Sequence, residues 1–303
     1  MKLLITGAIN WTEKDLTDIK NIGYEVQFIQ DERIPLIQQN ILVEKIEGVI
    51  CNGLFLYNDI KDFHNLKFIQ LTSAGYDRVP LDYINKKNIK VFNANNVYNI
   101  PIAEFVINGI LQLYKYSSFF YENKKKKEWK KCRNLMELYN KRICIVGCGN
   151  IGKECAKRFK AFGCYVEGVD LNHIKSKYFN FIHSVDKLDE LLECCDIVII
   201  TLPLTNETKR IINATRLNKM RPSCIFVNVS RGEIVDQEAL IKILDDKQIF
   251  GAVLDVFDNE PLDKKNKLWN LENVILSPHN SFVGEGNMNR LKKIIFANLQ
   301  KLK

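Results

Sequence analysis

The sequence of 303 residues is poor in the features that mark membrane, metal-binding and disulfide-rich proteins. No apolar run approaches the roughly 20 residues that a membrane-spanning helix needs. The first residues, Met1 to Gly7, become polar too early for a secretory signal. There are four histidines, and the nine cysteines are scattered without a Cys-x-x-Cys pair, so we expect reduced thiols and no metal site. These absences predict a cytoplasmic protein with no membrane partner.

Positive charge is in excess, with a formal net charge of +8 at pH 7. Much of it lies in one run, Lys124 to Lys131, which is typical of a solvated helix face or loop. No recognised nucleic-acid-binding module accompanies this run. A mildly positive surface serves equally well to attract small anionic substrates. We therefore predict no nucleic-acid partner, and the sequence leaves the role of the run open.

Apolar, β-branched stretches alternate with helical stretches along the chain, which is typical of α/β proteins. In the first third, we expect strands at 2–5, 25–29, 48–50, 67–71 and 90–92, with helices at 13–21 and 34–45. Pro101 then opens an apolar helix that runs to Tyr114. From residue 142 onwards, we expect strands at 142–146, 165–169, 196–200, 223–229, 250–255 and 273–276, with helices at 153–162, 186–194, 214–220, 236–244 and 286–302. Because the later apolar runs are continuous, they predict a parallel sheet covered on both faces.

The chain is organised around a Gly-x-Gly-x-x-Gly motif at Gly147, Gly149 and Gly152. It follows a predicted strand and precedes a predicted helix, and a second strand ends about 20 residues later on Asp170. In a dinucleotide-binding fold, the first glycine permits a tight turn, the second admits a pyrophosphate and the third allows close helix–strand packing. The helix N-terminus offers N–H groups to the anion, and an acid at that distance binds the adenosine ribose. The motif therefore predicts a bound dinucleotide.

Three chemically distinct side chains follow later strands, namely Arg231, Glu260 and His279. Because the carboxyl ends of parallel strands share one edge of a sheet, we expect them to gather where the glycine turn lies. An arginine can hold a substrate carboxylate in a forked pair, and a histidine can move the proton that accompanies hydride transfer. A glutamate bonded to the imidazole orients the ring and keeps its acid form available. Beside a nicotinamide, these groups form a complete set for hydride transfer.

At this point the sequence resembles the D-isomer-specific 2-hydroxyacid dehydrogenases, which include phosphoglycerate dehydrogenases and glyoxylate or hydroxypyruvate reductases. The resemblance covers nearly the whole chain and rests on several long motifs in one order. They are GCGNIG at 147–152, LPLT at 202–205, NVSRGEIVD at 228–236, LDVF at 254–257 with EPL at 260–262, and SPH at 277–279. One departure follows, because Asn280-Ser281-Phe282 stand where many members have a small apolar residue and then glycine or threonine. We expect this departure to alter the cofactor-side wall.

The resemblance implies a role for each residue that matches a family motif. Arg231, Glu260 and His279 are implied as the catalytic residues, and Arg231 is also implied to bind substrate. The remaining matches are Gly147, Gly149, Asn150, Ile151 and Gly152 beside the pyrophosphate, Asp170 at the ribose, Leu202, Pro203, Val229, Ser230, Arg231 and His279 along the cofactor, Asp255 at the nicotinamide amide, and Ala74 and Gly75 in the substrate-side loop.

The resemblance also implies a domain layout and an assembly. The family combines two Rossmann-like domains with parallel sheets, and its cofactor domain is inserted into a flavodoxin-like substrate domain. In this chain, that layout places the substrate domain at 1–98 plus 285–303 and the NAD-binding domain at 99–284. Family members are commonly dimers through the cofactor domain, so we expect a homodimer.

The leading hypothesis is an NAD-dependent oxidoreductase that interconverts a small 2-oxo acid and a D-2-hydroxy acid. Asp170 favours NAD because its carboxylate would repel a 2′-phosphate, while His173 and Lys175 keep NADP open as a less favoured cofactor. Two alternatives remain, a non-catalytic NAD(H)-sensing binding protein on the same scaffold and an S-adenosylmethionine enzyme. The sequence does not name the substrate, so glyoxylate, hydroxypyruvate, 3-phosphoglycerate and longer 2-oxo acids all remain open.

Overall fold

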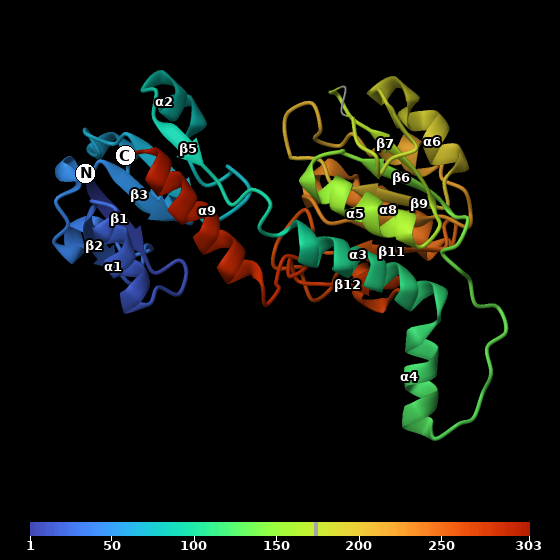
Figure 1. Ribbon diagram of the computed structural model, residues 1–303. Helices are drawn as coiled ribbons and strands as arrows, with labels where there is room; N and C mark the ends of the chain where they lie inside the picture. Colours follow the sequence, from blue (N-terminus) through green and yellow to red (C-terminus); the bar gives the residue numbers. More distant parts are fainter. Residues whose placement is uncertain (173–174) are drawn as a thin grey trace. The chain divides into compact units, whose positions relative to one another are not determined.

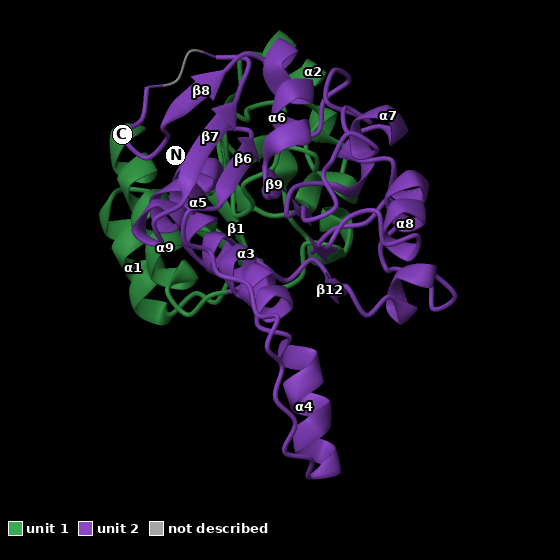
Figure 2. Cartoon of the chain, turned by 90° about the vertical axis from the view of Figure 1, so that its right-hand side faces the viewer, with its two compact units in different colours: residues 1–98, 284–303 green, residues 99–283 purple. Residues whose placement is uncertain are grey.

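The computed structural model of the chain describes residues 1–172 and 175–303 and contains two compact units (Figure 1). Unit 1 combines Met1–Tyr98 with Gly284–Lys303, and unit 2 comprises Asn99–Val283. The colours of Figure 2 separate the two units, and unit 2 is one segment of the sequence between the two parts of unit 1. Each unit contains one parallel sheet with helices, so the predicted fold class is confirmed.

Unit 1 is built on a five-stranded parallel sheet in the order β2-β1-β3-β4-β5, which is the flavodoxin-like order. The strands are β1 (Lys2–Thr6), β2 (Glu25–Ile29), β3 (Gly48–Cys51), β4 (Phe68–Leu71) and β5 (Lys90–Phe92). The α-helices are α1 (Glu13–Asn21), α2 (Leu81–Lys86) and α9 (Asn287–Lys301). Leu3 and Ile5 of the sheet share a core with Ile19 of α1 and with Leu291 and Ile295 of α9. The C-terminal helix therefore completes the core of the N-terminal segment.

The prediction of one helix over residues 34–45 is wrong. This segment forms two short 3-10 helices, Leu36–Gln39 and Val43–Lys45, instead of one α-helix. Asn40 ends the first of them in the left-handed conformation, with a φ of 55°. A residue in that conformation cannot continue a right-handed helix. Side chains from this segment nevertheless reach the core on the second face of the sheet.

Unit 2 is built on a seven-stranded parallel sheet in the order β12-β11-β10-β9-β6-β7-β8. If β6 is counted as strand 1 of the unit, the strands from β8 to β11 have the order 3-2-1-4-5-6, which is that of dinucleotide-binding folds. The strand β12 is added at the edge beside β11. The strands are β6 (Arg142–Val146), β7 (Tyr165–Val169), β8 (Phe181–His183), β9 (Ile197–Ile200), β10 (Ile225–Asn228), β11 (Gly251–Leu254) and β12 (Val274–Leu276). The sequence pattern predicted all of them except β8, an edge strand with only two apolar residues, Phe181 and Ile182.

Helices cover both faces of this sheet, as its continuous apolar strands require. Two helices, α3 (Asn99–Tyr114) and α5 (Asn150–Ala161), pack against each other and on one face (Figure 1). The second face carries α6 (Leu188–Cys194), α7 (Ala214–Leu217) and α8 (Gln237–Asp245), which share a core with β9, β10 and β11. Within the described residues, no helix is both long and apolar enough to cross a membrane.

The sequence pattern did not predict helix α4 (Ser117–Lys126), which extends away from the rest of unit 2 (Figure 2). A residue in the left-handed conformation flanks the helix at each end, Tyr116 with a φ of 49° and Lys127 with a φ of 58°. The lysine run forms the end of this helix and the start of the extended segment that follows. Trp129 in that segment is 95% exposed. We call residues 117–139 the α4 arm.

All seven strands of unit 2 run in the same direction, so their carboxyl ends share one edge of the sheet. The glycine turn follows β6 at this edge. Arg231, Glu260 and His279 follow β10, β11 and β12, which are consecutive strands in the sheet. Ligands of doubly wound sheets bind at such an edge.

Candidate active site

The glycine turn between β6 and α5 is bonded to the end of β7 and packs closely on the start of α5. Gly147 has a φ of 103°, and its N–H donates to the carbonyl oxygen of Val169 at 2.8 Å. A Cβ on Gly152 would lie 2.1 Å from the carbonyl oxygen of Gly147. By contrast, a Cβ on Gly149 would meet no atom of the described residues within 4 Å. Open space therefore lies beside the glycine at which a pyrophosphate approaches in this fold.

The start of α5 and the end of β7 supply the polar groups that a dinucleotide needs. Among the described residues, no side chain caps α5 at Gly149, so this helix end presents its positive dipole to an anion. The carboxylate of Asp170 accepts the N–H of Cys148 at 2.8 Å and that of Asn172 at 2.9 Å, which ties the turn to the end of β7. A carboxylate keeps further lone pairs for ribose hydroxyls. These groups fit NAD, and His173, which kept NADP open, lies outside the described residues.

Asn228, which the sequence pattern did not single out as a site residue, fixes the loop after β10. Four further predicted cofactor residues follow β9 and β10, namely Leu202, Pro203, Val229 and Ser230. The hydroxyl of Ser230 donates to the side-chain oxygen of Asn228 at 2.8 Å. The side-chain nitrogen of Asn228 donates to the carbonyl oxygen of Arg231 at 3.0 Å. One buried amide thus holds both Ser230 and the backbone of Arg231.

His279 and Glu260 are joined by a direct hydrogen bond, with 2.8 Å between Nδ1 of the imidazole and Oε2 of the carboxylate. Oε1 of Glu260 accepts the N–H of Phe257 at 3.1 Å, so both carboxylate oxygens are fixed. The N–H of His279 donates to the carbonyl oxygen of Asp255 at 2.8 Å. Within the described chain, Nε2 of His279 has no hydrogen-bond partner, and the side chain is 39% exposed. The imidazole is held at one nitrogen and open at the other, as proton transfer to a substrate requires.

Arg231 lies on the loop after β10, the strand next to the one that precedes Glu260. Its Nη1 donates to the carbonyl oxygen of Ser230 at 2.8 Å. The following Gly232 packs on the backbone of Phe257, because a Cβ there would lie 2.0 Å from the carbonyl carbon of Phe257. The loops that carry Arg231 and Glu260 are therefore in direct contact.

Asp255 is 1% exposed, and its carboxylate is bonded to the segment that follows His279. Oδ1 accepts the N–H groups of Asn280 at 2.8 Å and of Ser281 at 3.0 Å, and Oδ2 accepts the hydroxyl of Ser281. Ser281 is buried, whereas Phe282 is 40% exposed and its ring stands edge-on to the imidazole of His279. The departure at 280–282 thus combines a buried anchor with an exposed aromatic ring. The nicotinamide contact of Asp255 stays a prediction.

The predicted substrate residues Ala74 and Gly75 lie in unit 1, on the loop after β4, whereas the residues above belong to unit 2. The carbonyl oxygen of Ala74 accepts a hydrogen bond from Asn93 Nδ2 at 2.6 Å. That of Gly75 accepts the hydroxyl of Ser73 at 3.0 Å. No described residue accepts the N–H groups of Ala74 and Gly75. The loop is fixed through its carbonyl groups, and its N–H groups are the ones suited to a carboxylate.

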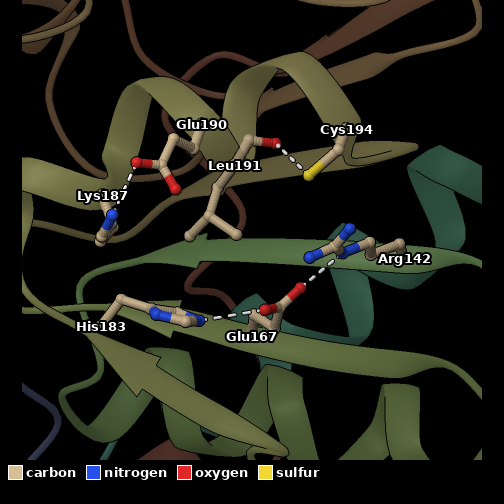
Figure 3. A pocket seen from close by; sticks show the side chains of 7 residues that line it. All are labelled: Arg142, Glu167, His183, Lys187, Glu190, Leu191 and Cys194. Atoms are coloured by element: carbon tan, nitrogen blue, oxygen red, sulfur yellow. Dashed lines mark hydrogen bonds and ion pairs between the residues drawn. The ribbon is translucent and has the colours of Figure 1, made fainter.

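A cavity of about 310 Å³ in unit 2 is lined by none of the predicted site residues (Figure 3). Glu167 on β7 bonds to Arg142 Nε at 2.6 Å and to His183 Nε2 at 3.0 Å. Burial raises the pKa of Glu167, but the hydrogen bonds from Arg142 and His183 outweigh burial and hold the pKa below its ordinary value. Lys187 and Glu190 form a second pair at 2.7 Å. The charged side chains that line the cavity therefore already pair with one another.

Comparison with known proteins places the chain among dehydrogenases. A family model described as D-isomer specific 2-hydroxyacid dehydrogenase, NAD binding domain, matches residues 107–281. A glyoxylate reductase of Thermococcus gammatolerans is 32% identical over 98% of this chain and 91% of its own. A D-3-phosphoglycerate dehydrogenase of Methanocaldococcus jannaschii is 31% identical over 92% of this chain and 53% of its own. The crystal structure of a glyoxylate reductase from Paecilomyes thermophila has the same fold, with a TM-score of 0.86, 21% identity, and coverage of 99% of this chain and 94% of that one.

Proposed function

The chain belongs to the D-isomer specific 2-hydroxyacid dehydrogenases, and from this membership we propose which residues carry out the reaction. The protein is an NAD-dependent oxidoreductase that interconverts a 2-oxo acid and a 2-hydroxy acid. We propose Arg231, Glu260 and His279 as its catalytic residues. The 2.8 Å hydrogen bond between His279 and Glu260, at the same sheet edge as Arg231, is the observation that supports this assignment.

In the proposed reduction, Arg231 binds the carboxylate of the 2-oxo acid in a forked pair and polarises the adjacent carbonyl group. His279 donates a proton from Nε2 to the oxygen on C2, and it takes this proton back in the oxidation. Glu260 accepts the N–H at Nδ1, which fixes the ring and leaves Nε2 as the nitrogen that faces the substrate. The nicotinamide, when bound, supplies or accepts the hydride at its C4.

We propose that the cofactor binds along the carboxyl edge of unit 2. The residues that would hold it are Gly147, Gly149, Asn150, Ile151, Gly152, Asp170, Leu202, Pro203, Val229, Ser230, Arg231, Asp255 and His279. The N–H groups of Ala74 and Gly75, which no described residue accepts, are suited to the substrate carboxylate. On this proposal, unit 1 is the substrate domain and unit 2 is the NAD-binding domain.

NADH oxidation with a panel of 2-oxo acids tests the function. The panel contains glyoxylate, hydroxypyruvate and longer 2-oxo acids, and NADH binding is measured in parallel by fluorescence. We expect turnover of at least one of these acids. A protein that binds NADH and turns over none of them would instead be an NAD(H)-sensing binding protein.

Replacing Asp170 by asparagine is expected to shift the cofactor preference toward NADP(H). Asparagine keeps an oxygen for the N–H of Cys148 but removes the charge that repels a 2′-phosphate. We expect the ratio of kcat/KM for NADPH to kcat/KM for NADH to rise about tenfold, or ~1.4 kcal/mol. Asp186→Asn changes an exposed acid of the same unit and should leave this ratio unaltered. An unaltered ratio in Asp170→Asn would contradict the assignment of Asp170 to the ribose.

We propose that the protein is a cytoplasmic homodimer that associates through unit 2. Its nine cysteines are free thiols, which suits a reducing compartment. The α4 arm exposes Phe120 (39%), Tyr121 (58%) and Trp129 (95%), and grouped apolar side chains mark interaction surfaces. Sedimentation should give about twice the chain mass of 35.2 kDa, and Trp129→Ala should shift the equilibrium toward the monomer. A monomer of the unaltered protein at micromolar concentration would exclude this dimer.

A further inference from the structure

The three proposed catalytic residues lie on three separate loops, so their relative positions depend on what holds these loops together. Glu260 and His279 are joined by their own hydrogen bond. Arg231 lies on the loop between β10 and α8, and this loop needs another link to the loop that carries Glu260. Arg210, which precedes α7, supplies such a link.

The guanidinium group of Arg210 bonds to both loops at once. Nη1 donates to the carbonyl oxygen of Val235 at 2.9 Å, and Val235 follows Arg231 on the first loop. Nη2 donates to Oδ2 of Asp258 at 2.9 Å, and Asp258 precedes Glu260 on the second loop. The planar fork of arginine, with its several donors, allows bonds to two partners in different directions.

The backbone of Arg210 is tied to the first loop as well. Its N–H donates to the carbonyl oxygen of Glu233 at 2.9 Å. Two residues further on, Ile212 forms a parallel β-bridge with Val235. Arg210 has a φ of 56°, in the left-handed region that residues with side chains rarely adopt. The backbone and side-chain bonds together hold Arg210 in this conformation.

Arg210 also offsets negative charge that gathers between the loops. Burial raises the pKa of Asp258, Arg210 opposes this rise, and the carboxylates of Glu233 and Asp236 add to it. Glu233 is paired with Lys209 at 2.6 Å, while the carboxylate of Asp236 lies 3.5 Å from Nη1 of Arg210. Without the guanidinium group, Asp236 and Asp258 would repel each other across the two loops.

The contact between the loops leaves little room for independent movement. Gly232 touches the backbone of Phe257 with no side chain between them. Any repulsion that separates the loops therefore moves Arg231 away from Glu260 and from the imidazole bonded to it. Because misplacement of reacting groups by about 1 Å costs on the order of 100-fold in rate, such a movement would affect turnover directly.

We propose that Arg210 is a positioning residue that fixes the distance between Arg231 and the Glu260–His279 pair. It acts through the two loops and not through contact with the substrate. This inference rests on the proposed function, in which Arg231 binds the substrate carboxylate and His279 moves the proton.

Kinetics of Arg210→Ala and Arg210→Lys test the proposal on the full-length chain, with the 2-oxo acid that the unaltered protein turns over. We expect Arg210→Ala to lower kcat/KM for that acid about 10- to 100-fold, through both a lower kcat and a higher KM. NADH affinity should fall much less than kcat/KM, because the glycine turn and Asp170 follow β6 and β7 and make no bond to Arg210 within the described residues. Lysine restores the positive charge but lacks the forked guanidinium group that reaches both loops. The kcat/KM of Arg210→Lys should therefore lie between that of Arg210→Ala and that of the unaltered protein. Millimolar guanidinium chloride should raise the rate of Arg210→Ala and not that of the unaltered protein.

Arg216→Ala is the matched control for a purely structural role. Arg216 likewise donates to a carboxylate, that of Asp189 at 2.8 Å, and to a carbonyl oxygen, that of Ile211 at 2.8 Å. Within the part of the chain that the structure describes, it makes no bond to the catalytic loops. We expect Arg216→Ala to lower the melting temperature while kcat and KM stay unchanged. The proposal is overturned if Arg210→Ala behaves like Arg216→Ala, with a lower melting temperature and unaltered kinetics. An unaltered protein that turns over no 2-oxo acid would overturn the proposed function and this inference together.

Discussion

Replacing His279 by alanine is expected to lower kcat for reduction of the 2-oxo acid by about 10²–10⁴-fold. The variant lacks the group that donates a proton to the oxygen on C2, and water would have to replace it. NADH affinity should change far less, because the glycine turn and Asp170 lie at the ends of other strands. Steady-state kinetics measures the first effect and fluorescence titration with NADH the second.

Glu260→Gln distinguishes proton transfer from a general disturbance of the site. Glutamine keeps one side-chain oxygen for the N–H of Phe257, but it has no second oxygen to accept the N–H at Nδ1 of His279. Because the hydrogen bond to Nδ1 orients the ring for proton transfer from Nε2, kcat should fall in this variant while NADH affinity changes little. Unaltered kcat in His279→Ala or in Glu260→Gln would remove the acid–base pair from the mechanism.

The parallel sheets were predictable because strands covered on both faces leave a strong pattern in the sequence. All four residues of Ile197–Ile200 are buried, for example, and such a run is apolar at every position. The same pattern is weak where a strand is short or lies at an edge, as in β8, where Phe181 is 60% exposed. The sequence pattern also gave a wrong prediction at residues 34–45, where the left-handed Asn40 divides the segment into two 3-10 helices.

For the candidate site, the sequence could predict which residues gather at the sheet edge but not which of them touch. The parallel topology alone brings the loops after β10, β11 and β12 together. The contacts of Arg210, Asn228 and Ser281 depend on the conformations of these loops, and a left-handed arginine follows no sequence pattern. Ser281 was visible only as a departure from a family motif, and its burial against Asp255 came from the structure.

Replacing Arg231 by alanine is expected to lower kcat/KM for the 2-oxo acid by about 10²–10⁴-fold. A forked pair contains two charge-assisted hydrogen bonds, each worth about 1.5–3 kcal/mol, and alanine removes both. Arg231→Lys keeps the charge without the fork, so it should lose about 10- to 100-fold. Arg221→Ala is the control, because Arg221 lies before β10, at the opposite end of the strand, where it bonds to the carbonyl oxygen of Cys194.

A substrate without a carboxylate identifies what Arg231 binds. If the guanidinium group holds the carboxylate, Arg231→Ala should lose much less activity on a carbonyl compound that lacks this group, because the interaction is absent from both proteins being compared. The ratio of the two losses then measures the coupling between Arg231 and the carboxylate, free of any general effect on the loop. Equal losses on both substrates would place Arg231 at the carbonyl oxygen alone, and unaltered kinetics on the 2-oxo acid would exclude it from the site. Since Gly232 joins this loop to the backbone of Phe257, the same pair of substrates also separates direct binding by Arg231 from displacement of Glu260.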